Sequence, residues 1–329
     1  MEWYGFYCHF MLKSLFQCPI CNVELIKQVE YYKINELFLL WKPIEFSHET
    51  INEHLQMADA TQLYKCDKCR LEIFLPQIIG SSSFYIEAYN LKGMQSNSEF
   101  TYSEDKWDFE QAGIDIENDQ SRVIEIGCGN GNFLEQIQDK LLSVAGVEYN
   151  LAALETAKAK GLNVCSPEDI DDTYVGKWDA VVSFHVLEHV GDPVKFVREM
   201  ASLAKPDGLI GISVPNQDGP IKYIRPCVMN MPPHHATRWC KRSFEALAHK
   251  LDLEITRVTF EPLLLENHSY YSVYWVKNII PGKWFLPTFF RQVLSGALRI
   301  FFGTLYRAGI KTFPLLKGQS IYVAMKKRK

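Results

Sequence analysis

The chain has 329 residues, of which 47% are hydrophobic and 22% charged, with a formal net charge of −4 and a pI near 6.2. This composition can build one large domain with an appendage or two domains. The mild acidity argues against a large nucleic-acid-binding surface, which would require an excess of Lys and Arg.

The N-terminal stretch MEWYGFYCHFMLKSLF is apolar but makes a poor signal peptide. Glu2 lies where a basic region is needed, and no small-residue cleavage site follows. Met11 is an alternative start of translation to Met1. Because no run of about 18 uncharged apolar residues occurs, we expect a cytoplasmic protein without a simple transmembrane helix.

Four of the nine cysteines form two CxxC pairs, Cys18 with Cys21 and Cys66 with Cys69. Two such pairs are typical of a structural Zn²⁺ site with four thiolate ligands, and the long intervening loop costs little closure entropy. We therefore predict a zinc-ribbon-like module over residues 1–75. Four reduced thiols without metal are the alternative, and a redox CxxC suits two matched pairs less well.

Residues 76–121 mix aromatic and polar side chains and are predicted to form connecting helices. From Arg122 onward, signals for strands and helices alternate, which predicts a parallel α/β sheet. The expected strands cover 122–127, 143–150, 163–166, 178–184, 208–216, 253–263 and 319–327. The expected helices cover 132–141, 151–161, 192–208 and 242–252, with Gly161 ending the second and Pro206 the third.

The segment VIEIGCGNG places a glycine loop directly after the first of these strands. A dinucleotide fingerprint, GxGxxG, would need glycine where this chain has Asn132, so the pattern is GxGxG instead. Glu125 beside the loop would repel a pyrophosphate but suits a ligand that carries an ammonium group. Glu148, at the end of the second strand, can accept hydrogen bonds from both hydroxyls of a ribose.

Four motifs in order, EIGCGNG, GVEYN, WDAVVSFHVLEHVGDP and LAKPDGLIGISVPN, resemble the class I S-adenosylmethionine-dependent methyltransferases. The resemblance runs from about Arg122 to Asp252 and returns in the last strand. It implies a Rossmann-like, seven-stranded methyltransferase sheet over residues 122–265 and 317–329, with S-adenosyl-L-methionine as cofactor. Taken singly, each motif is also compatible with a plain strand-to-helix turn.

The resemblance also implies which residues contact the cofactor. The glycine loop would pass close to the methionine part, Glu148 would hold the ribose, and Glu168 or Asp169 would approach the adenine amine. Tyr102 and Trp107 resemble lid aromatics of related enzymes, with a place in the core as the alternative. The full set of predicted cofactor-binding residues is Glu125, Gly127, Cys128, Gly129, Gly131, Glu148, Tyr149, Glu168, Asp169, Phe184 and His185.

Methyl transfer from a sulfonium is a direct displacement that depends mainly on positioning. A hydroxyl or acidic carbon acceptor also needs a general base, a role for which histidine is well suited near neutral pH. FHVLEHV contains His185 and His189, while MPPHHATRW, in a proline-stiffened loop after the fifth strand, contains His234 and His235. We predict His185, His235 and His234 as catalytic candidates. The alternatives are capping or packing for His189, and binding of a backbone carbonyl for one of the loop pair.

Residues 266–316 form an insertion before the last strand, dense in Phe, Leu and Ile and with Arg291, Arg299 and Arg307 at eight-residue intervals. Three roles stay open for it: peripheral membrane contact through 279–310, a helical cap over the active site, or a homodimer surface.

The sequence therefore predicts a methyltransferase that acts on a small-molecule, sugar or lipid-linked glycan acceptor in the cytoplasm, with or without membrane contact. One alternative is an rRNA or tRNA methyltransferase that binds its target through the zinc module, although the acidic charge balance weakens it. The other is a non-catalytic interaction protein that binds S-adenosylmethionine.

Overall fold

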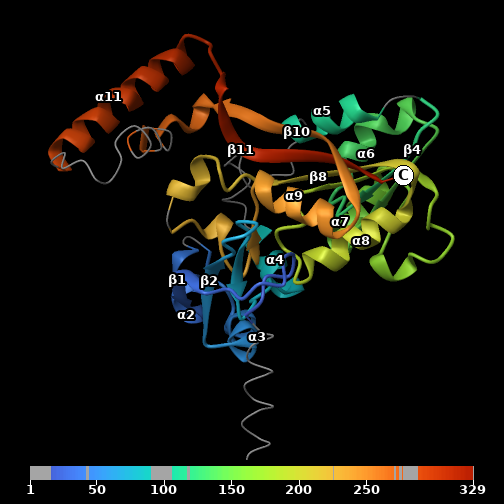
Figure 1. Cartoon of the computed structure of the whole chain (residues 1–329), viewed down its shortest axis with the longest axis horizontal. Helices are drawn as coiled ribbons and strands as arrows, with labels where there is room; N and C mark the ends of the chain where they lie inside the picture. The colour runs from blue at the N-terminus through green and yellow to red at the C-terminus, as the bar shows by residue number, and fades with distance from the viewer. Residues whose placement is uncertain are drawn as a thin grey trace, which may run out of the picture.

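The structure is a computed structural model that describes residues 16–41, 44–89, 106–116, 119–224, 226–269, 272–273, 276 and 288–328. Met11, Tyr102 and residues 277–287 of the predicted insertion lie outside the described residues. The described chain contains a seven-stranded and a four-stranded sheet, with one long helix extending from the end of the larger sheet (Figure 1).

The larger sheet has the strand order β10-β11-β8-β7-β4-β5-β6. Its parallel part consists of β4 (Arg122–Ile126), β5 (Ser143–Val147), β6 (Val164–Cys165), β7 (Trp178–Phe184) and β8 (Ala204–Pro215). β11 (Thr312–Lys327) runs antiparallel between β8 and β10 (Leu253–Leu264). This is the predicted Rossmann-like seven-stranded sheet.

The strand order reverses at β4, since the chain proceeds to β5 and β6 on one side and to β7 and β8 on the other. At such a reversal, the loops beyond the carboxyl ends of the strands diverge and leave a crevice in which ligands bind. The glycine loop follows β4, and the FHVLEHV turn follows β7. The topology therefore brings two of the predicted motifs to the same crevice.

Helices cover both faces of this sheet, and a hydrophobic core fills each face (Figure 1). They are α5 (Trp107–Asp115), α6 (Asn132–Ile137), α7 (Leu151–Ala159), α8 (Pro193–Leu203) and α9 (Lys241–Lys250). Gly161 follows α7 with φ +79°, as its predicted place at a helix end requires.

The predicted end of one helix is wrong. α8 ends at Leu203. Pro206 lies near the start of β8, in an irregular stretch where the register with β7 shifts between Trp178 and Ala180. Proline is tolerated at such a site because it interrupts no regular ladder.

The smaller sheet is antiparallel and has the order β1-β2-β3-β9. Its strands are β1 (Lys27–Lys33), β2 (Ala60–Lys65), β3 (Glu72–Leu75) and β9 (Thr237–Arg238), accompanied by α2 (Ile34–Leu40), α3 (His48–Met57) and α4 (Ser82–Tyr89). β9 comes from the loop after β8. The sheet thus crosses the boundary at residue 75 that we drew from the sequence.

The insertion contains η5 (Leu265–Asn267) and α11 (Thr288–Arg307), and α11 extends away from the body of the molecule (Figure 1). A small separate core of Leu263, Leu265 and Phe302 joins α11 to the end of β10. β11 already begins at Thr312, opposite Leu264, so the last strand is longer than predicted. In the part of the chain that the structure describes, no helix is long and apolar enough to cross a membrane.

Candidate functional site

A cavity of about 2070 Å³ opens at the carboxyl ends of β4, β5 and β7. Most of the residues predicted from the sequence line it, namely Gly127, Gly129, Glu148, Tyr149, Glu168, Phe184, His185, His234 and His235. Glu125 and Cys128 line a small recess of about 50 Å³ beside the glycine loop. Gly131 and Asp169 are found in the lining of neither space.

The glycine loop can only be built from glycine at its key positions. Gly127 and Gly131 have φ +79° and +76°, in the left-handed region that side chains disfavour. A Cβ on Gly127 would lie 2.3 Å from Cγ2 of Val186, and one on Gly131 would lie 2.2 Å from Cδ1 of Leu162. The loop therefore presents bare backbone to the cavity, while Gly131 serves the packing of α6 against α7.

Glu148 is held by the loop that it faces. Its two carboxylate oxygens accept hydrogen bonds from the backbone N–H groups of Gly129 and Asn150, each at 2.7 Å. A carboxylate offers about four lone-pair positions, so each oxygen retains capacity for a further donor. Both oxygens are thus oriented and can still bind a pair of vicinal hydroxyls.

The structure separates the two candidates for the adenine contact. Glu168 lines the cavity, whereas the carboxylate of Asp169 accepts hydrogen bonds from the backbone N–H and the hydroxyl of Ser166, at 3.1 and 3.0 Å. Asp169 thereby stabilises the short turn η2 (Pro167–Asp169). Of the two residues, Glu168 is the one that remains available for a ligand.

Glu125 is buried, with 3% of its surface exposed, and its Oε2 has no hydrogen-bond partner among the described residues. Burial raises the pKa of Glu125 to about 8, with smaller contributions from neighbouring charges. A cation placed beside this carboxyl would favour its ionised form. The neighbouring Cys128 is also buried, which raises the pKa of its thiol and leaves it a poor nucleophile.

His185 lies between two buried carboxylates. Its Nε2 is 3.2 Å from Oδ2 of Asp108, and its Nδ1 is 3.4 Å from Oε1 of Glu188. Asp108 also accepts a hydrogen bond of 2.6 Å from the hydroxyl of Ser213. Burial alone would lower the pKa of His185, but its interactions with the two carboxylates raise it to about 10.

His185 is therefore an imidazolium at neutral pH, with both ring nitrogens protonated. It lies in the cavity as predicted, but this geometry does not support it as a general base. Its backbone φ of +55° is unusual for a residue other than glycine and turns the chain sharply after β7. With both N–H groups facing carboxylates, this cationic side chain can stabilise negative charge on an acceptor but cannot deprotonate it.

His234 and His235 are buried side by side, with ring centroids 4.5 Å apart, and burial lowers the pKa of both. His189 joins them, with its ring centroid 4.7 Å from that of His234 and 4.8 Å from that of His235. The two sequence motifs with paired histidines thus meet in space. Because both loop imidazoles are neutral, they offer lone pairs at the wall of the cavity.

Sequence reasoning missed Asp108, Ser213 and Glu188. The sequence position of Glu188 could have identified it, because it lies three residues after His185 and directly before His189. Asp108 had no such signal, since α5 is brought to the sheet only by tertiary packing. Its neighbour Trp107 lines the cavity and also packs against the core.

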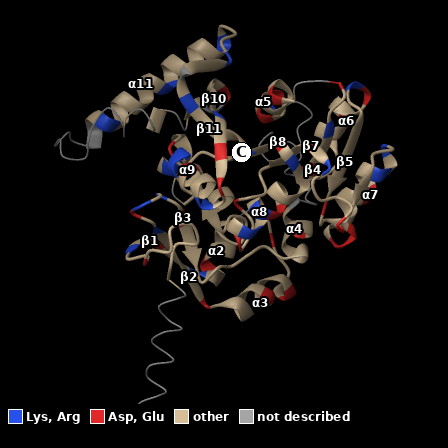
Figure 2. Cartoon of the chain, turned by 45° about the vertical axis from the view of Figure 1, so that its right-hand side comes forward, with Lys and Arg blue, Asp and Glu red and all other residues tan. Residues whose placement is uncertain are grey.

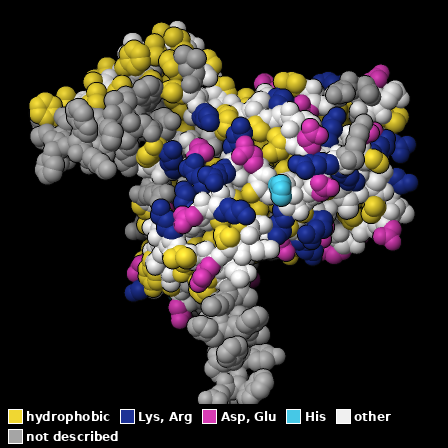
Figure 3. Space-filling model, viewed as in Figure 1, with side chains coloured by type: hydrophobic (Ala, Val, Ile, Leu, Met, Phe, Trp, Pro, Cys, Tyr) yellow, Lys and Arg dark blue, Asp and Glu magenta, His cyan; other side chains and the backbone are white. Residues whose placement is uncertain are grey.

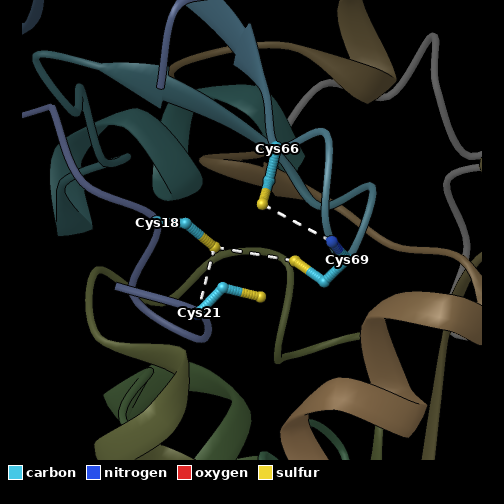
Figure 4. A group of neighbouring side chains, drawn as sticks. All are labelled: Cys18, Cys21, Cys66 and Cys69. Atoms are coloured by element: carbon cyan, nitrogen blue, oxygen red, sulfur yellow. Dashed lines mark hydrogen bonds between the residues drawn. The ribbon is translucent and has the colours of Figure 1, made fainter. Parts of the chain in front are cut away.

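The four predicted zinc ligands lie together, and their sulfur atoms face a common centre (Figure 4). All four Sγ atoms lie within 4.8 Å of one another, and the Cys18 and Cys69 sulfurs are 3.6 Å apart. Thiolates at 2.3 Å from a tetrahedral zinc would stand about 3.8 Å apart. The cluster therefore has the size that a zinc ion needs.

The two CxxC turns also have the same local geometry. In each, the N–H of the second cysteine lies 3.5 Å from the first sulfur, and the next residue is left-handed, Asn22 at φ 56° and Arg70 at φ 64°. Backbone N–H groups directed at sulfur stabilise thiolates. The paired turns thus fit a structural metal better than four independent thiols.

Residues 100–258 match the model of a family described as a methyltransferase domain. The ubiquinone biosynthesis O-methyltransferase of Escherichia coli is 32% identical over 106 residues, which cover 30% of this chain and 44% of that protein. The protein of the same name from Marinobacter nauticus is 29% identical over 164 residues, covering 43% of this chain and 68% of that protein.

The chain thus spans less than half the length of the first of these relatives. A solved S-adenosylmethionine-dependent methyltransferase from Archaeoglobus fulgidus aligns with a TM-score of 0.46 and 18% identity, over 72% of this chain and 100% of that one. The family match covers the glycine loop, both histidine motifs and β4 to β8. Residues 100–258 therefore match a methyltransferase domain, and the larger sheet of this chain has the seven strands expected from the resemblance to the class I S-adenosylmethionine-dependent methyltransferases.

Proposed function

We propose that this chain transfers a methyl group from S-adenosylmethionine to an oxygen atom of a small-molecule acceptor. The observation that carries the proposal is the oriented carboxylate of Glu148 beside a side-chain-free glycine loop, in the same cavity as His185, His234 and His235.

The described residues fit this cofactor at three points. Glu148 has lone pairs left for the ribose hydroxyls, and the backbone at Gly127 and Gly129 admits close approach of the methionine part. Glu125 is a buried carboxyl that lacks a partner for Oε2, which suits the ammonium group. When bound, S-adenosylmethionine supplies an electrophilic methyl group on a sulfonium.

The histidine side of the cavity suits an acceptor that must lose a proton. The positive charge of His185 can stabilise negative charge that develops on an acceptor oxygen, while the neutral imidazoles of His234 and His235 can accept its proton. The relatives named ubiquinone biosynthesis O-methyltransferases support an oxygen acceptor. A sugar or lipid-linked glycan is compatible with the same chemistry, because its hydroxyls make the same demands.

We further propose that Cys18, Cys21, Cys66 and Cys69 hold a structural Zn²⁺. With four thiolate ligands the coordination is complete, so the metal would contribute to folding and not to the reaction. Cys18, Cys66 and Cys69 lie in the core shared with Trp239 and Phe244, far from solvent.

For α11 we propose contact with a membrane surface. Its Phe290, Val293, Ile300 and Phe301 are exposed, and Figure 3 shows hydrophobic side chains gathered along this helix. Arg299 and Arg307 add positive charge, as anionic headgroups favour. No described residue of α11 lines the cavity, which speaks against the cap.

The test combines methyl transfer with cofactor binding. We expect label from methyl-labelled S-adenosylmethionine to enter the small-molecule or lipid fraction of an extract. Glu148→Ala should weaken cofactor binding, measured by calorimetry, by at least about 100-fold, because two oriented acceptors are lost. Its zinc content should equal that of the wild type.

Two outcomes would replace this proposal. Label found only in RNA would favour the RNA methyltransferase, for which the mixture of acidic and basic residues in Figure 2 offers little support. Cofactor binding without label in any fraction, together with indifference to His235→Ala, would favour a non-catalytic binding protein. Unchanged affinity in Glu148→Ala would remove Glu148 from the site.

A further inference from the structure

A second cluster of metal-ligating side chains lies apart from the cysteines. His189, His234 and His235 each place a ring nitrogen within 4.8 Å of the others. His234 and His235 are buried, at 4% exposure each, and all three residues line the large cavity. Three imidazoles therefore converge on one point at the wall of a site that a ligand can reach.

Two of the imidazoles are oriented by hydrogen bonds through Nδ1. Nδ1–H of His189 donates to the backbone carbonyl of His234 at 2.5 Å, and Nδ1–H of His235 donates to Oδ1 of Asn230 at 3.3 Å. This leaves Nε2 of each ring as a lone pair. Metal-binding histidines are held in the same way, with the second nitrogen bonded to a carbonyl or carboxylate.

The carboxylate of Glu188 lies beside these free nitrogens. Its Oε1 is 4.0 Å from Nε2 of His189 and 3.9 Å from Nε2 of His235. Glu188 is 1% exposed, and neither oxygen has a hydrogen bond among the described residues, although His185 lies at ion-pair distance. The imidazolium of His185 faces this buried carboxylate from one side, and a cation held by the three imidazoles would add a second positive charge beside it.

The backbone fixes the two motifs to each other. The carbonyl oxygen of Glu188 accepts hydrogen bonds from the N–H groups of Ala236 and Thr237, at 2.9 and 3.1 Å. The N–H of His235 donates to the carbonyl of Met231 at 3.0 Å. The histidines of the loop are thereby held against the turn that carries Glu188 and His189, so the cluster is preorganised.

We propose that His189, His234 and His235 bind one divalent transition-metal ion, with Glu188 as the carboxylate beside it. Imidazole ligands suit zinc, iron, copper and nickel, whereas magnesium and calcium prefer oxygen. Ligands at about 2.1 Å from a tetrahedral ion stand about 3.4 Å apart, so ring nitrogens that lie up to 4.8 Å apart need to approach each other by at most about 1.4 Å. Three protein ligands leave a position open toward the cavity.

The position of the ion has a consequence that rests on the proposed function. An acceptor hydroxyl bound at the open position would lose its proton more easily, because a bound cation stabilises the oxyanion. The ion would act as a Lewis acid, and the released proton would pass to the adjacent carboxylate of Glu188 instead of to His234 or His235, whose lone pairs the ion would occupy. Glu188 and His185 would complete the polar wall around the acceptor.

The test uses the full chain and Co²⁺ as a spectroscopic substitute at both proposed sites. A cobalt–thiolate complex gives an intense charge-transfer band that a cobalt–imidazole complex lacks, so the two sites can be told apart. We expect two cobalt ions per chain in the wild type. His189→Gln and His235→Gln should each bind one ion and keep the full thiolate band, which also reports that the chain is folded. His249→Gln, an exposed histidine on α9, should retain two ions.

One ion per chain in the wild type, with the thiolate band, would overturn the proposal and leave a cluster of packed imidazoles. Two ions in both glutamine variants would overturn it as well. If a variant loses the thiolate band through unfolding, the wild-type stoichiometry and the third variant, His234→Gln, decide. Metal counting is independent of methyl transfer, so a chain that binds two ions but transfers no methyl group contradicts only the proposed function.

Discussion

At the scale of single residues, the site is defined by carboxyl groups whose surroundings differ. Glu148 accepts hydrogen bonds from two backbone N–H groups, Asp108 lies against His185 and Ser213, and Glu125 is buried with no hydrogen-bond partner for Oε2 among the described residues. Burial consequently raises the pKa of Glu125 to about 8. Carboxyl groups thus serve three purposes here: one can accept hydrogen bonds from ribose hydroxyls, one pairs with an imidazolium, and one is a neutral acid that a bound cation would ionise.

This environment predicts a pH dependence of stability. The unfolded chain ionises Glu125 above its ordinary pKa of 4.5, while the folded chain keeps it protonated up to about pH 8. Stability should therefore fall as the pH rises through this interval and level off above it. Glu125→Gln removes this loss, so without cofactor it should exceed the wild type by roughly 2–4 kcal/mol at pH 8 and match it near pH 4.5.

Urea unfolding at a series of pH values measures this difference. Glu155→Gln, an exposed carboxylate on α7, provides the matched control and should follow the wild type at every pH. Parallel curves for Glu125→Gln and the wild type would show that Glu125 is already ionised in the folded chain.

At the scale of elements, α11 differs from the other helices in the number of exposed apolar residues that it carries. Among the described residues, one side of it packs, through Phe302 and its neighbours Leu298, Leu305 and Tyr306, against the end of β10. The exposed side carries Phe290, Val293, Ile300 and Phe301. A helix that was selected only for packing would not need this second apolar side.

If the exposed side of α11 contacts a membrane, a charge placed there should weaken binding to vesicles. Ile300 is 72% exposed on α11, and Ile114 is 65% exposed on α5. We expect Ile300→Asp to lower the affinity for vesicles with anionic lipid by about 10-fold, and Ile114→Asp to leave it unchanged, as measured by flotation. No vesicle binding by the wild type, with a dimer that Ile300→Asp dissociates in sedimentation, would identify α11 as a dimer surface instead.

At the scale of the whole molecule, the cysteine module and the methyltransferase sheet are joined by shared packing. Arg238 of β9 pairs with Glu30 of β1 at 3.0 Å, and Ser243 of α9 donates to the carbonyl of Cys69 at 3.2 Å. Three of the four cysteines belong to the same hydrophobic core as Trp239 and Phe244. Loss of the metal should therefore lower the stability of the chain beyond residue 75 as well.

We expect removal of zinc with a chelator, or Cys66→Ser, to lower the melting temperature of the entire chain by roughly 5–10 °C in one cooperative transition. Circular dichroism and calorimetry would measure it. Cys165→Ser, a thiol outside the cluster, should cost far less. Two separate transitions, with the larger one unchanged, would mean that the cysteine module folds independently.

The sequence by itself determined the order of strands and helices from Arg122 onward, the glycine loop, the carboxylate at the end of β5 and the two CxxC pairs. These features are local, because hydrophobic periodicity, glycine at positive φ and the spacing of metal ligands each depend on only a few consecutive residues. The same reasoning placed the end of α8 too late, because the register between β7 and β8 depends on both strands.

Only the tertiary structure decided what the histidines do. Asp108 and Glu188 turn His185 from a candidate base into a cation, and His189, His234 and His235 meet although 45 residues separate FHVLEHV from the loop that carries the pair. Likewise, β9 completes a sheet that begins at β1. The pKa of a group and the ligands of a metal depend on atoms within a few ångströms, and sequence spacing does not reveal which distant residues folding brings to that distance.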